Sequence, residues 1–191
     1  MSPAEKAEQL RRAQKQIGPT ILRECGKLAQ AGLGAVRRRL TGEVLSYRSG
    51  ALRRTAEGHA GAVAGGWEIR LQAGGGVDDV RYARIHEEGG VITPKRGRFL
   101  AIPLPPVLNA RGIAKSKPRD QKLTFVPIHG GAAGLLVKPS GRGKRRVFVA
   151  HWFLAPRVTI PKRPYLAPSM REVAEKAPAQ LQSAIRRLLV A

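Results

Sequence analysis

The side chains that could carry acid–base or metal chemistry are few in this 191-residue chain, and they are poorly grouped. No pair of histidines has the spacing that places two imidazoles on one face of a zinc-binding helix. A base and carboxylates are adjacent in one place, His86-Glu87-Glu88. Successive residues of a helix point about 100° apart, so these three side chains would not converge on one substrate or metal ion. We interpret His86 as a hydrogen-bonded structural residue. The four histidines are His59, His86, His129 and His151.

Carboxylates are too sparse for a metal-dependent nuclease, which needs several acids around its metal ions. Only Asp78, Asp79, Glu87 and Glu88 occur in proximity, and residues 91–191 hold 3 acids in all. The glycine run that ends at residue 76 is followed by neither the lysine nor the hydroxyl residue of a phosphate-binding loop. The sequence therefore predicts that the chain is not an enzyme, with no catalytic, cofactor-binding or metal-binding residues and no small-molecule substrate.

The charge points instead to a binding role. The chain has 35 Lys+Arg against 13 Asp+Glu, a formal net charge of +22, and residues 91–191 carry 20 basic and 3 acidic side chains, a net charge of +17. So strong a field implies an acidic partner, and nucleic acid, an acidic protein surface and an anionic membrane are the candidates. Because no stretch approaches the ~20 apolar residues of a membrane span, we expect a soluble, unexported chain without a membrane partner.

Two Gly/Pro-punctuated loops, residues 104–122 and 139–146, concentrate this charge. Their basic stretches contain no aromatic residue, so contact with phosphate or with an acidic surface is favoured over stacking on bases. The alternative is that the loops are merely solvated. The residues predicted to contact DNA or an acidic partner are Arg111, Lys115, Lys117, Arg119, Lys122, Arg142, Lys144, Arg145 and Arg146.

Helical patterns lie at both ends of the chain. Ser2-Pro3-Ala4-Glu5 is a capping box that begins a helix, which we expect to end at Gly18-Pro19. A second helix over residues 20–40 would bury Cys25 as a small hydrophobic side chain rather than a reactive thiol. Near the C-terminus Ser169 and Glu172 form another capping box, and an apolar stripe follows that Pro178 should kink or divide into two short helices.

Strand patterns fill the middle of the chain. Alternation over residues 67–71 predicts a half-buried strand, and residues 123–128 and 135–138 predict a hairpin. Further strands are expected at 91–92, 99–103, 147–154 and 158–160. The predicted fold is α+β, an antiparallel β-sheet with long hairpins packed by an N-terminal and a C-terminal helix. We expect an N-terminal helical arm (1–40), a β-rich domain with the basic loops (41–168) and a C-terminal helix on that domain (169–191).

Three short motifs occur in a familiar order. A turn with Ser49, Gly50 and Leu52 comes first, and the other two follow: Tyr82-Ala83-x-Ile85-His86-Glu87-x-Gly89-Gly90 and Ile160-Pro161-x-Arg163-Pro164-Tyr165-Leu166. This order, over about residues 41–190, resembles the tailed-bacteriophage virion morphogenesis proteins, the Mu-like G group and related neck or tail-completion proteins. The chain differs from that group in a basic insertion at about residues 93–146.

The resemblance implies a structural virion protein: a neck or tail-completion subunit that forms a homo-oligomeric ring at the head-to-tail junction and joins the head connector to the tail. Its partners would be copies of itself, neighbouring head-completion and tail proteins, and double-stranded DNA, with assembly in the bacterial host cytoplasm. The alternative is a sequence-independent nucleic-acid-binding protein. In the proteins that the chain resembles, the second and third motifs are scaffold elements without catalysis. Their residues here are Tyr82, His86, Glu87, Gly89, Gly90, Pro161, Arg163, Pro164, Tyr165 and Leu166. Within this scaffold we expect Arg163 to pair with Glu87 or Glu88.

Overall fold

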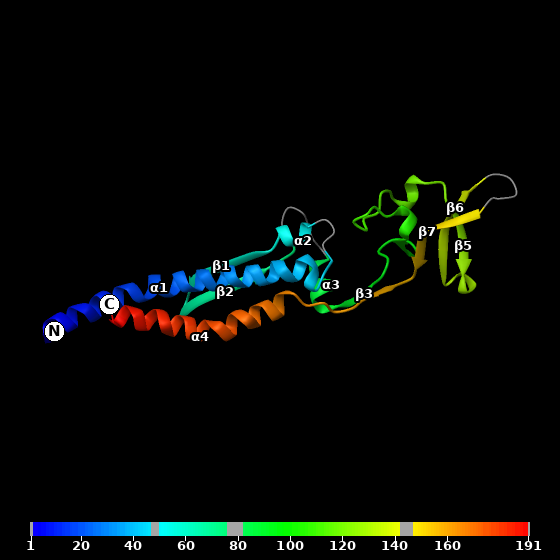
Figure 1. Ribbon diagram of the computed structural model, residues 1–191. Helices are drawn as coiled ribbons and strands as arrows, with labels where there is room; N and C mark the ends of the chain where they lie inside the picture. Colours follow the sequence, from blue (N-terminus) through cyan, green and yellow to red (C-terminus); the bar gives the residue numbers. More distant parts are fainter. Residues whose placement is uncertain (1, 47–49, 76–81, 142–146, 191) are drawn as a thin grey trace. The chain divides into compact units, whose positions relative to one another are not determined.

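The computed structural model describes residues 2–46, 50–75, 82–141 and 147–190 (Figure 1). The chain forms two compact units. Met1–Glu88 and Arg163–Ala191 make up the first, here called the helical unit, and Gly89–Lys162 make up the second, the sheet unit. The α+β class with antiparallel sheets is confirmed. This division differs from the predicted boundaries at residues 40 and 168, because the two terminal helices pack against each other in one unit.

The N-terminal helix is α1, Pro3–Arg38. Its predicted capping box is confirmed: the Ser2 Oγ accepts a hydrogen bond from the Glu5 amide (3.3 Å), and the Ser2 amide donates to the Glu5 carboxylate (2.6 Å). The predicted break at Gly18-Pro19 is wrong, since one helix continues through Pro19. A proline removes one hydrogen bond of a helix. The buried face runs on from Ala13 through Ile21 to Val36, and this packing offsets the loss.

The C-terminal helix is α4, Leu166–Val190, which runs antiparallel to α1 so that the two chain ends lie together (Figure 1). Its apolar stripe is confirmed: Val173 is buried, and Met170, Ala177, Leu181, Ile185 and Leu188 are partly buried. Ala184, outside the predicted stripe, is buried as well. α4 is one helix rather than the two short ones considered above, and Pro178 lies inside it on the exposed side. A buried carboxylate also links the two helices: Glu24 accepts hydrogen bonds from Lys27 (2.7 Å) and from Gln180 of α4 (2.9 Å).

A π-helical turn, η1 (Arg39–Glu43), ends α1, and the short helix α2 (Ala51–Arg54) follows it. The hairpin of β1 (Glu57–Val63) and β2 (Gly66–Gln72) then returns along α1. The strand predicted at 67–71 is confirmed; on its apolar side Ile69 and Leu71 are partly buried, whereas Trp67 is exposed (42%). Ser49 of the predicted turn lies outside the described residues, and Gly50 precedes α2 with φ of 73°.

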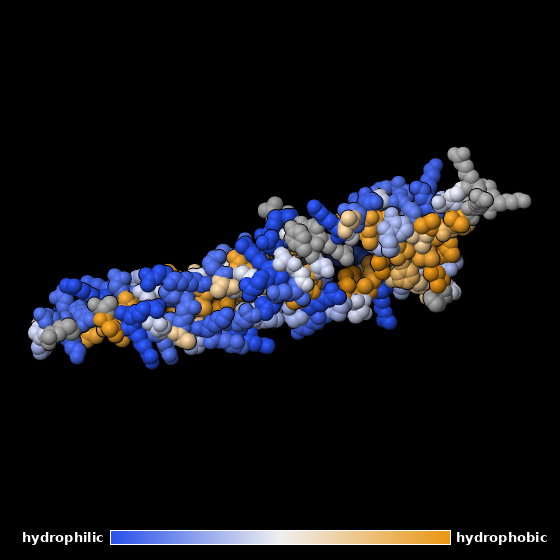
Figure 2. Space-filling view, viewed as in Figure 1, coloured by the Kyte–Doolittle hydropathy of each residue, from blue (hydrophilic) through white to orange (hydrophobic). Residues whose placement is uncertain are grey.

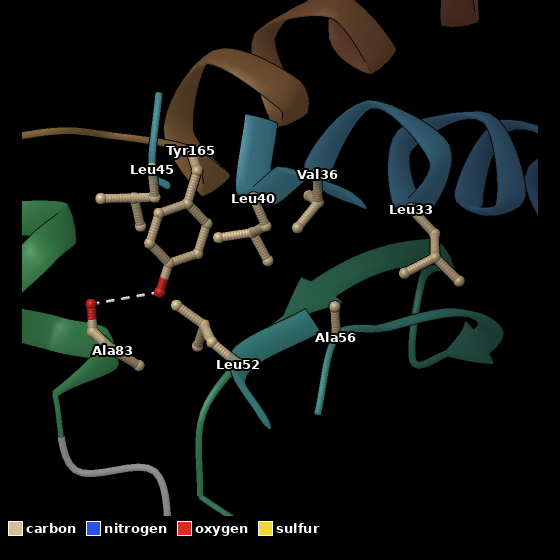
Figure 3. Close-up of a cluster of buried hydrophobic side chains, with 8 residues drawn as sticks. All are labelled: Leu33, Val36, Leu40, Leu45, Leu52, Ala56, Ala83 and Tyr165. Carbon is tan, nitrogen blue, oxygen red and sulfur yellow. Dashed lines mark hydrogen bonds between the residues drawn. The ribbon is translucent and has the colours of Figure 1, made fainter. Parts of the chain in front are cut away.

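Glycine permits close packing at two places in this unit. A Cβ on Gly32 of α1 would lie 2.7 Å from Val173 Cγ2, and one on Gly58 of β1 would lie 2.7 Å from the Ala29 carbonyl oxygen. The core next to these contacts contains eight side chains, drawn in Figure 3. They are Leu33, Val36, Leu40, Leu45, Leu52, Ala56, Ala83 and Tyr165.

The sheet unit contains two antiparallel sheets. β3 (Gly90–Ile92) pairs with β8 (Val158–Ile160), and a larger sheet has the order β4-β7-β6-β5. The strands of the larger sheet are β4 (Leu100–Pro103), β5 (Thr124–Ile128), β6 (Ala133–Ser140) and β7 (Val147–Ala155). The predicted hairpin is confirmed as β5 and β6, joined through the 3-10 turn η4 (His129–Gly131).

The loop predicted at 104–122 extends to residue 123 in the structure and is interrupted by the 3-10 turns η2 (Pro105–Val107) and η3 (Pro118–Asp120). Its one buried hydrophobic side chain is Val107. Among the described residues of this unit, the other buried apolar side chains are few: Ala133, Val137, Trp152 and Ala155. Most of the large sheet's apolar surface is therefore left partly or fully exposed.

Candidate functional site

Two of the family-like motifs meet where the short helix α3 (Ala83–Glu88) lies beside the beginning of α4. The Glu87 carboxylate accepts hydrogen bonds from three successive backbone amides, those of Tyr165 (2.7 Å), Leu166 (3.0 Å) and Ala167 (2.8 Å). The first amides of a helix have no partner within the helix, and a negative charge is favourable at that end of its dipole. Glu87 thus caps α4 from a distant part of the sequence.

The predicted capping box at Ser169 and Glu172 is therefore wrong. Ser169 lies within α4 and is fully buried, where its Oγ donates to the Tyr165 carbonyl oxygen (2.7 Å) and accepts from Arg39 Nη1 (3.0 Å). Glu172 forms an ion pair with Arg39, whose hydrogen bond lowers the pKa of this carboxyl group. Because Glu87 supplies the cap, Ser169 and Glu172 are free to connect α4 to the end of α1.

The expected ion pair between Arg163 and Glu87 or Glu88 is also wrong. Glu87 is engaged by backbone amides, and Glu88 pairs with Arg84 across one helical turn at 2.8 Å. Arg163 instead contributes its backbone amide, which donates to the His86 carbonyl oxygen (2.8 Å), while its side chain is exposed. Arg163 thus joins the two motifs through its backbone, while the side chains of Glu87 and Tyr165 supply the other hydrogen bonds between them.

His86 is partly buried at this junction, with the Tyr82 ring edge-on at a centroid separation of 5.8 Å. Its Nδ1 is buried and has no hydrogen-bond partner among the described residues, so the expected hydrogen-bonded imidazole is wrong for this atom. Burial, and secondarily the positive charge of Arg163, lower the pKa of His86. Both effects favour the neutral ring.

Tyr165 anchors the proline segment in the core of the helical unit. It is fully buried, and its hydroxyl donates to the Ala83 carbonyl oxygen at 3.1 Å (Figure 3). Burial, followed by the charges of Glu87 and Tyr82, raises its pKa to about 12. Tyr82 is 42% exposed, and Ala83 is the buried residue of this turn.

Of the remaining motif residues, Pro164 lies in the helical unit and is partly buried, whereas Gly89, Gly90 and Pro161 lie in the sheet unit. Gly89 and Gly90 have the positive φ expected at a chain reversal, 74° and 151°. A Cβ on Gly89 would lie 2.9 Å from the Lys162 amide nitrogen, so glycine is also required by space. Gly90 pairs with Ile160 at the start of the β3–β8 ladder, and Pro161 ends that ladder.

A pocket of about 320 Å³ opens beside the junction, within the helical unit. Its lining includes Glu87, Glu88, Arg84 and Tyr165. All four are engaged in the hydrogen bonds described above, which gives the pocket a structural explanation. Asp78 and Asp79, the other acids considered above, lie outside the described residues.

The five predicted contact residues of the first basic loop are all exposed. They are Arg111, Lys115, Lys117, Arg119 and Lys122. The loop is ordered by its own backbone contacts: Asn109 Oδ1 accepts from the amides of Arg111 and Ile113, and Asp120 accepts from the Lys117 amide, all at 2.9–3.0 Å. Among the described residues, none of these five side chains has a carboxylate in ion-pair distance. The loop therefore presents unneutralised positive charge.

The second predicted set, Arg142, Lys144, Arg145 and Arg146, lies outside the described residues. Within the described ranges, no group of His, Cys, Asp and Glu side chains is arranged to hold a metal ion. The same ranges contain no helix with the length and hydrophobicity needed to span a bilayer. Comparisons with protein-family models, with curated proteins and with solved structures find no match to this chain.

Proposed function

We propose that the chain is a structural subunit of a tailed-phage virion, a neck or tail-completion protein that forms a ring at the head-to-tail junction. The observation that carries this proposal is the junction around Glu87. The two motifs that resemble the virion morphogenesis proteins lie 70 or more residues apart in sequence, and they are hydrogen-bonded into one scaffold. This supports the structural role that the resemblance implies for them.

The charge of the sheet unit supports the same proposal. Residues 89–162 carry 15 basic and 1 acidic side chain, a net charge of +14, and the described cations of the 104–122 loop are exposed. A subunit that surrounds DNA, or that stacks on an acidic ring, needs such a surface. In the proposal this unit faces the virion neighbours, while the helical unit supplies the rigid body of the subunit.

The deciding experiment measures the mass of the purified protein by light scattering at low and moderate salt, with and without duplex DNA. Negative-stain images of the same samples would show the subunit arrangement. We expect a closed oligomer with a fixed number of subunits that forms without DNA, because a ring is closed by its own interfaces. A monomer that is indifferent to DNA would mean that assembly requires the virion neighbours.

A second candidate, a sequence-independent nucleic-acid-binding protein, is favoured by the same excess of charge. It differs from the first in stoichiometry and in salt dependence. A monomer whose affinity for duplex DNA collapses as the salt concentration rises would favour this candidate over the ring.

A further inference from the structure

The hairpin of β1 and β2 leaves two long strand edges without a neighbouring strand among the described residues. Each strand has seven residues, the register between them shows no bulge, and neither strand contains proline or lysine. The other described sheet edges are short or contain proline: β3 and β8 have three residues each, β4 ends at Pro103, and β5 contains Pro127. Proline, lysine and bulges commonly protect edge strands, so the hairpin has the unprotected edges of this chain.

The turn of the hairpin determines which backbone groups of β1 point outward. Val63 pairs with Gly66 across a two-residue turn, so these two residues exchange both hydrogen bonds, and alternate residues along β1 do the same with their partners. The residues between them, Gly58, Ala60 and Ala62, therefore direct their amides and carbonyl oxygens away from β2. Within the part of the chain that the structure describes, none of these backbone groups has a hydrogen-bond partner.

The edge of β1 faces away from the C-terminal helix. α1 packs on both strands of the hairpin, whereas α4 packs on α1 and on β2. In the view of Figure 1, β1 and α4 lie on opposite sides of α1, so a further strand fits beside β1 without displacing α4. Figure 2 shows a mainly hydrophilic surface over α1 and α4, with hydrophobic residues in small groups. On this face the unit therefore offers a partner the unpaired backbone of β1 rather than a broad apolar patch.

We propose that the β1 edge pairs with the β1 edge of a second copy of the chain, antiparallel and about a two-fold axis at Ala60. In this register Ala60 lies opposite the partner's Ala60, and Gly58 lies opposite the partner's Ala62, so every outward backbone group of the three residues is paired. The two hairpins form one four-stranded sheet in the order β2-β1-β1-β2. The pairing does not rest on the proposed ring, which needs a head-to-tail contact instead.

The side chains of β1 fit this register. Those on the face toward α1 are glycine or alanine, which are too small to obstruct a second strand. On the other face, His59 lies opposite the partner's Gly61, and Glu57 lies opposite the partner's Val63, so no charge faces a like charge. The two Glu57 side chains are six residues out of register, which at ~3.3 Å per residue separates them by roughly 20 Å, beyond the ~8 Å Debye length at physiological salt.

Helix spacing and net charge favour the same partner. Two strands span about 9.6 Å, twice the ~4.8 Å strand spacing, and helices pack at ~8–10 Å. Because α1 packs on both strands of its hairpin, the α1 helices of the two copies would lie side by side, with the α4 helices outside them. The helical unit carries 20 basic and 12 acidic side chains, a net charge of +8, against +14 for the smaller sheet unit. The copies therefore meet through the less charged unit.

Cysteine cross-linking tests the register. His59 and Gly61 face each other only across the two-fold pair, as a pair without mutual hydrogen bonds whose Cα separation of ~4.5 Å suits a disulfide. We expect His59→Cys with Gly61→Cys to give at least about tenfold more covalent dimer on mild oxidation than the control, since His59 is exposed and nothing lies within 4 Å of a Cβ on Gly61. The matched control is Glu68→Cys with Arg70→Cys, which has the same spacing on β2. Cys25 is buried and present in both variants.

Ala60→Pro tests the backbone hydrogen bonds. The Ala60 amide points away from β2, so proline there removes no hydrogen bond of the hairpin but removes the central donor from both strands of the proposed pair. Sedimentation velocity of the full chain over a dilution series gives the dissociation constant of the dimer, whose mass is twice the 20.7 kDa of the chain. We expect this constant to rise at least about tenfold in the variant. Urea unfolding verifies the fold, and if the variant unfolds, the wild-type mass and the cross-linking still decide.

Three results would overturn the proposal. A wild-type chain that stays monomeric throughout the dilution series would leave the β1 edge to a strand of another protein. Covalent dimers from a mixture of the single variants His59→Cys and Arg70→Cys, with none from the β1 double variant, would assign a head-to-tail contact between β1 and β2. A dimer unaffected by Ala60→Pro would place the contact elsewhere.

The outcome is separable from that of the ring measurement. A ring that forms equally well in Ala60→Pro retains the proposed function and overturns the pairing. A dimer that associates no further retains the pairing and removes the ring.

Discussion

Glu87 and Tyr165 lie 78 positions apart in the chain, and the Glu87 carboxylate accepts a hydrogen bond of 2.7 Å from the Tyr165 amide. The same carboxylate accepts from the next two amides, so one side chain of α3 caps α4. The first turn of α4 is therefore stabilised by a tertiary contact. The stability of the helical unit should depend on this one residue.

Glu87→Ala should lower the free energy of unfolding by about 1–3 kcal/mol, because three amides lose a charged acceptor. Glu87→Gln should cost less, since its carbonyl oxygen can still accept. The matched control is Glu88→Ala, which removes an exposed pair with Arg84 and should change stability by less than about 0.5 kcal/mol. Urea unfolding of the three variants gives the comparison, and equal costs at the two positions would rule out the capping role.

Arg39 is the second tertiary contact of α4, where it bonds to Ser169 and forms an ion pair with Glu172. Its side chain is 17% exposed, so its removal leaves a buried hydroxyl and a carboxylate without their donor. We expect Arg39→Ala to cost about 1–3 kcal/mol of unfolding free energy. In a double-mutant cycle with Glu172→Ala, the two losses should be less than additive, and strict additivity would contradict a direct pairing.

These contacts also explain where sequence patterns sufficed and where they did not. The capping box at Ser2 and the alternation over residues 67–71 depend on neighbours in sequence, and both were predicted correctly. The Ser169 box has the same local pattern and would make Met170 the first helical residue, yet α4 begins four residues earlier, at Leu166, because Glu87 supplies a better acceptor. The pattern predicts a break at Pro19 and a kink or division at Pro178, whereas packing between α1 and α4 keeps both helices continuous.

The surface of the sheet unit was only half predictable. The excess of cations can be counted in the sequence, and five of the predicted residues are exposed on the 104–122 loop. The exposed apolar residues of β5 and β7 were missed, because a run such as Val147–Leu154 has the composition of a buried strand. Whether such a strand is covered depends on the other elements of its unit, which are not encoded locally. The one available signal was the shortage of apolar residues in the 104–122 loop that could cover the sheet.

Gly32 should tolerate no side chain. A Cβ there would lie 2.7 Å from Val173 Cγ2 and 2.8 Å from a Leu71 methyl group, both in the packed core of the helical unit. Gly32→Ala should therefore cost about 1–3 kcal/mol of unfolding free energy. Gly26→Ala is the matched control in the same helix. Nothing lies within 4 Å of its Cβ position, and the higher helix propensity of alanine should make that variant more stable by up to about 1 kcal/mol. Thermal unfolding of both variants tests the difference in sign.

His86 should make the stability of the helical unit depend on pH. Its pKa in the folded protein is lowered by burial, so the unfolded chain binds the proton more readily near its ordinary pKa of about 6.5. The unfolding free energy should fall as the pH decreases below about 6.5, until the folded protein also takes up the proton. Urea unfolding between neutral pH and about pH 5 tests this, and His86→Asn should flatten the profile in that window. An unchanged profile in the variant would assign the dependence to other groups.

The last prediction concerns the exposed cations of the 104–122 loop. Lys115 and Lys117 have no ion-pair partner among the described residues, so replacing both with Gln should leave the unfolding free energy within about 0.5 kcal/mol of the wild type. The effect should appear in binding. If both lysines contact phosphate, the slope of log K against log salt concentration for duplex DNA should become shallower by about 2.

Replacing Lys6 and Lys15 of α1, which are also exposed but lie in the helical unit, is the control for total charge. An unchanged slope in the loop variant, or an equal change in both variants, would mean that the loop has no particular role in contacting anions. A shallower slope in the loop variant alone would locate the anion contact on this loop, whether the natural partner is DNA or an acidic protein.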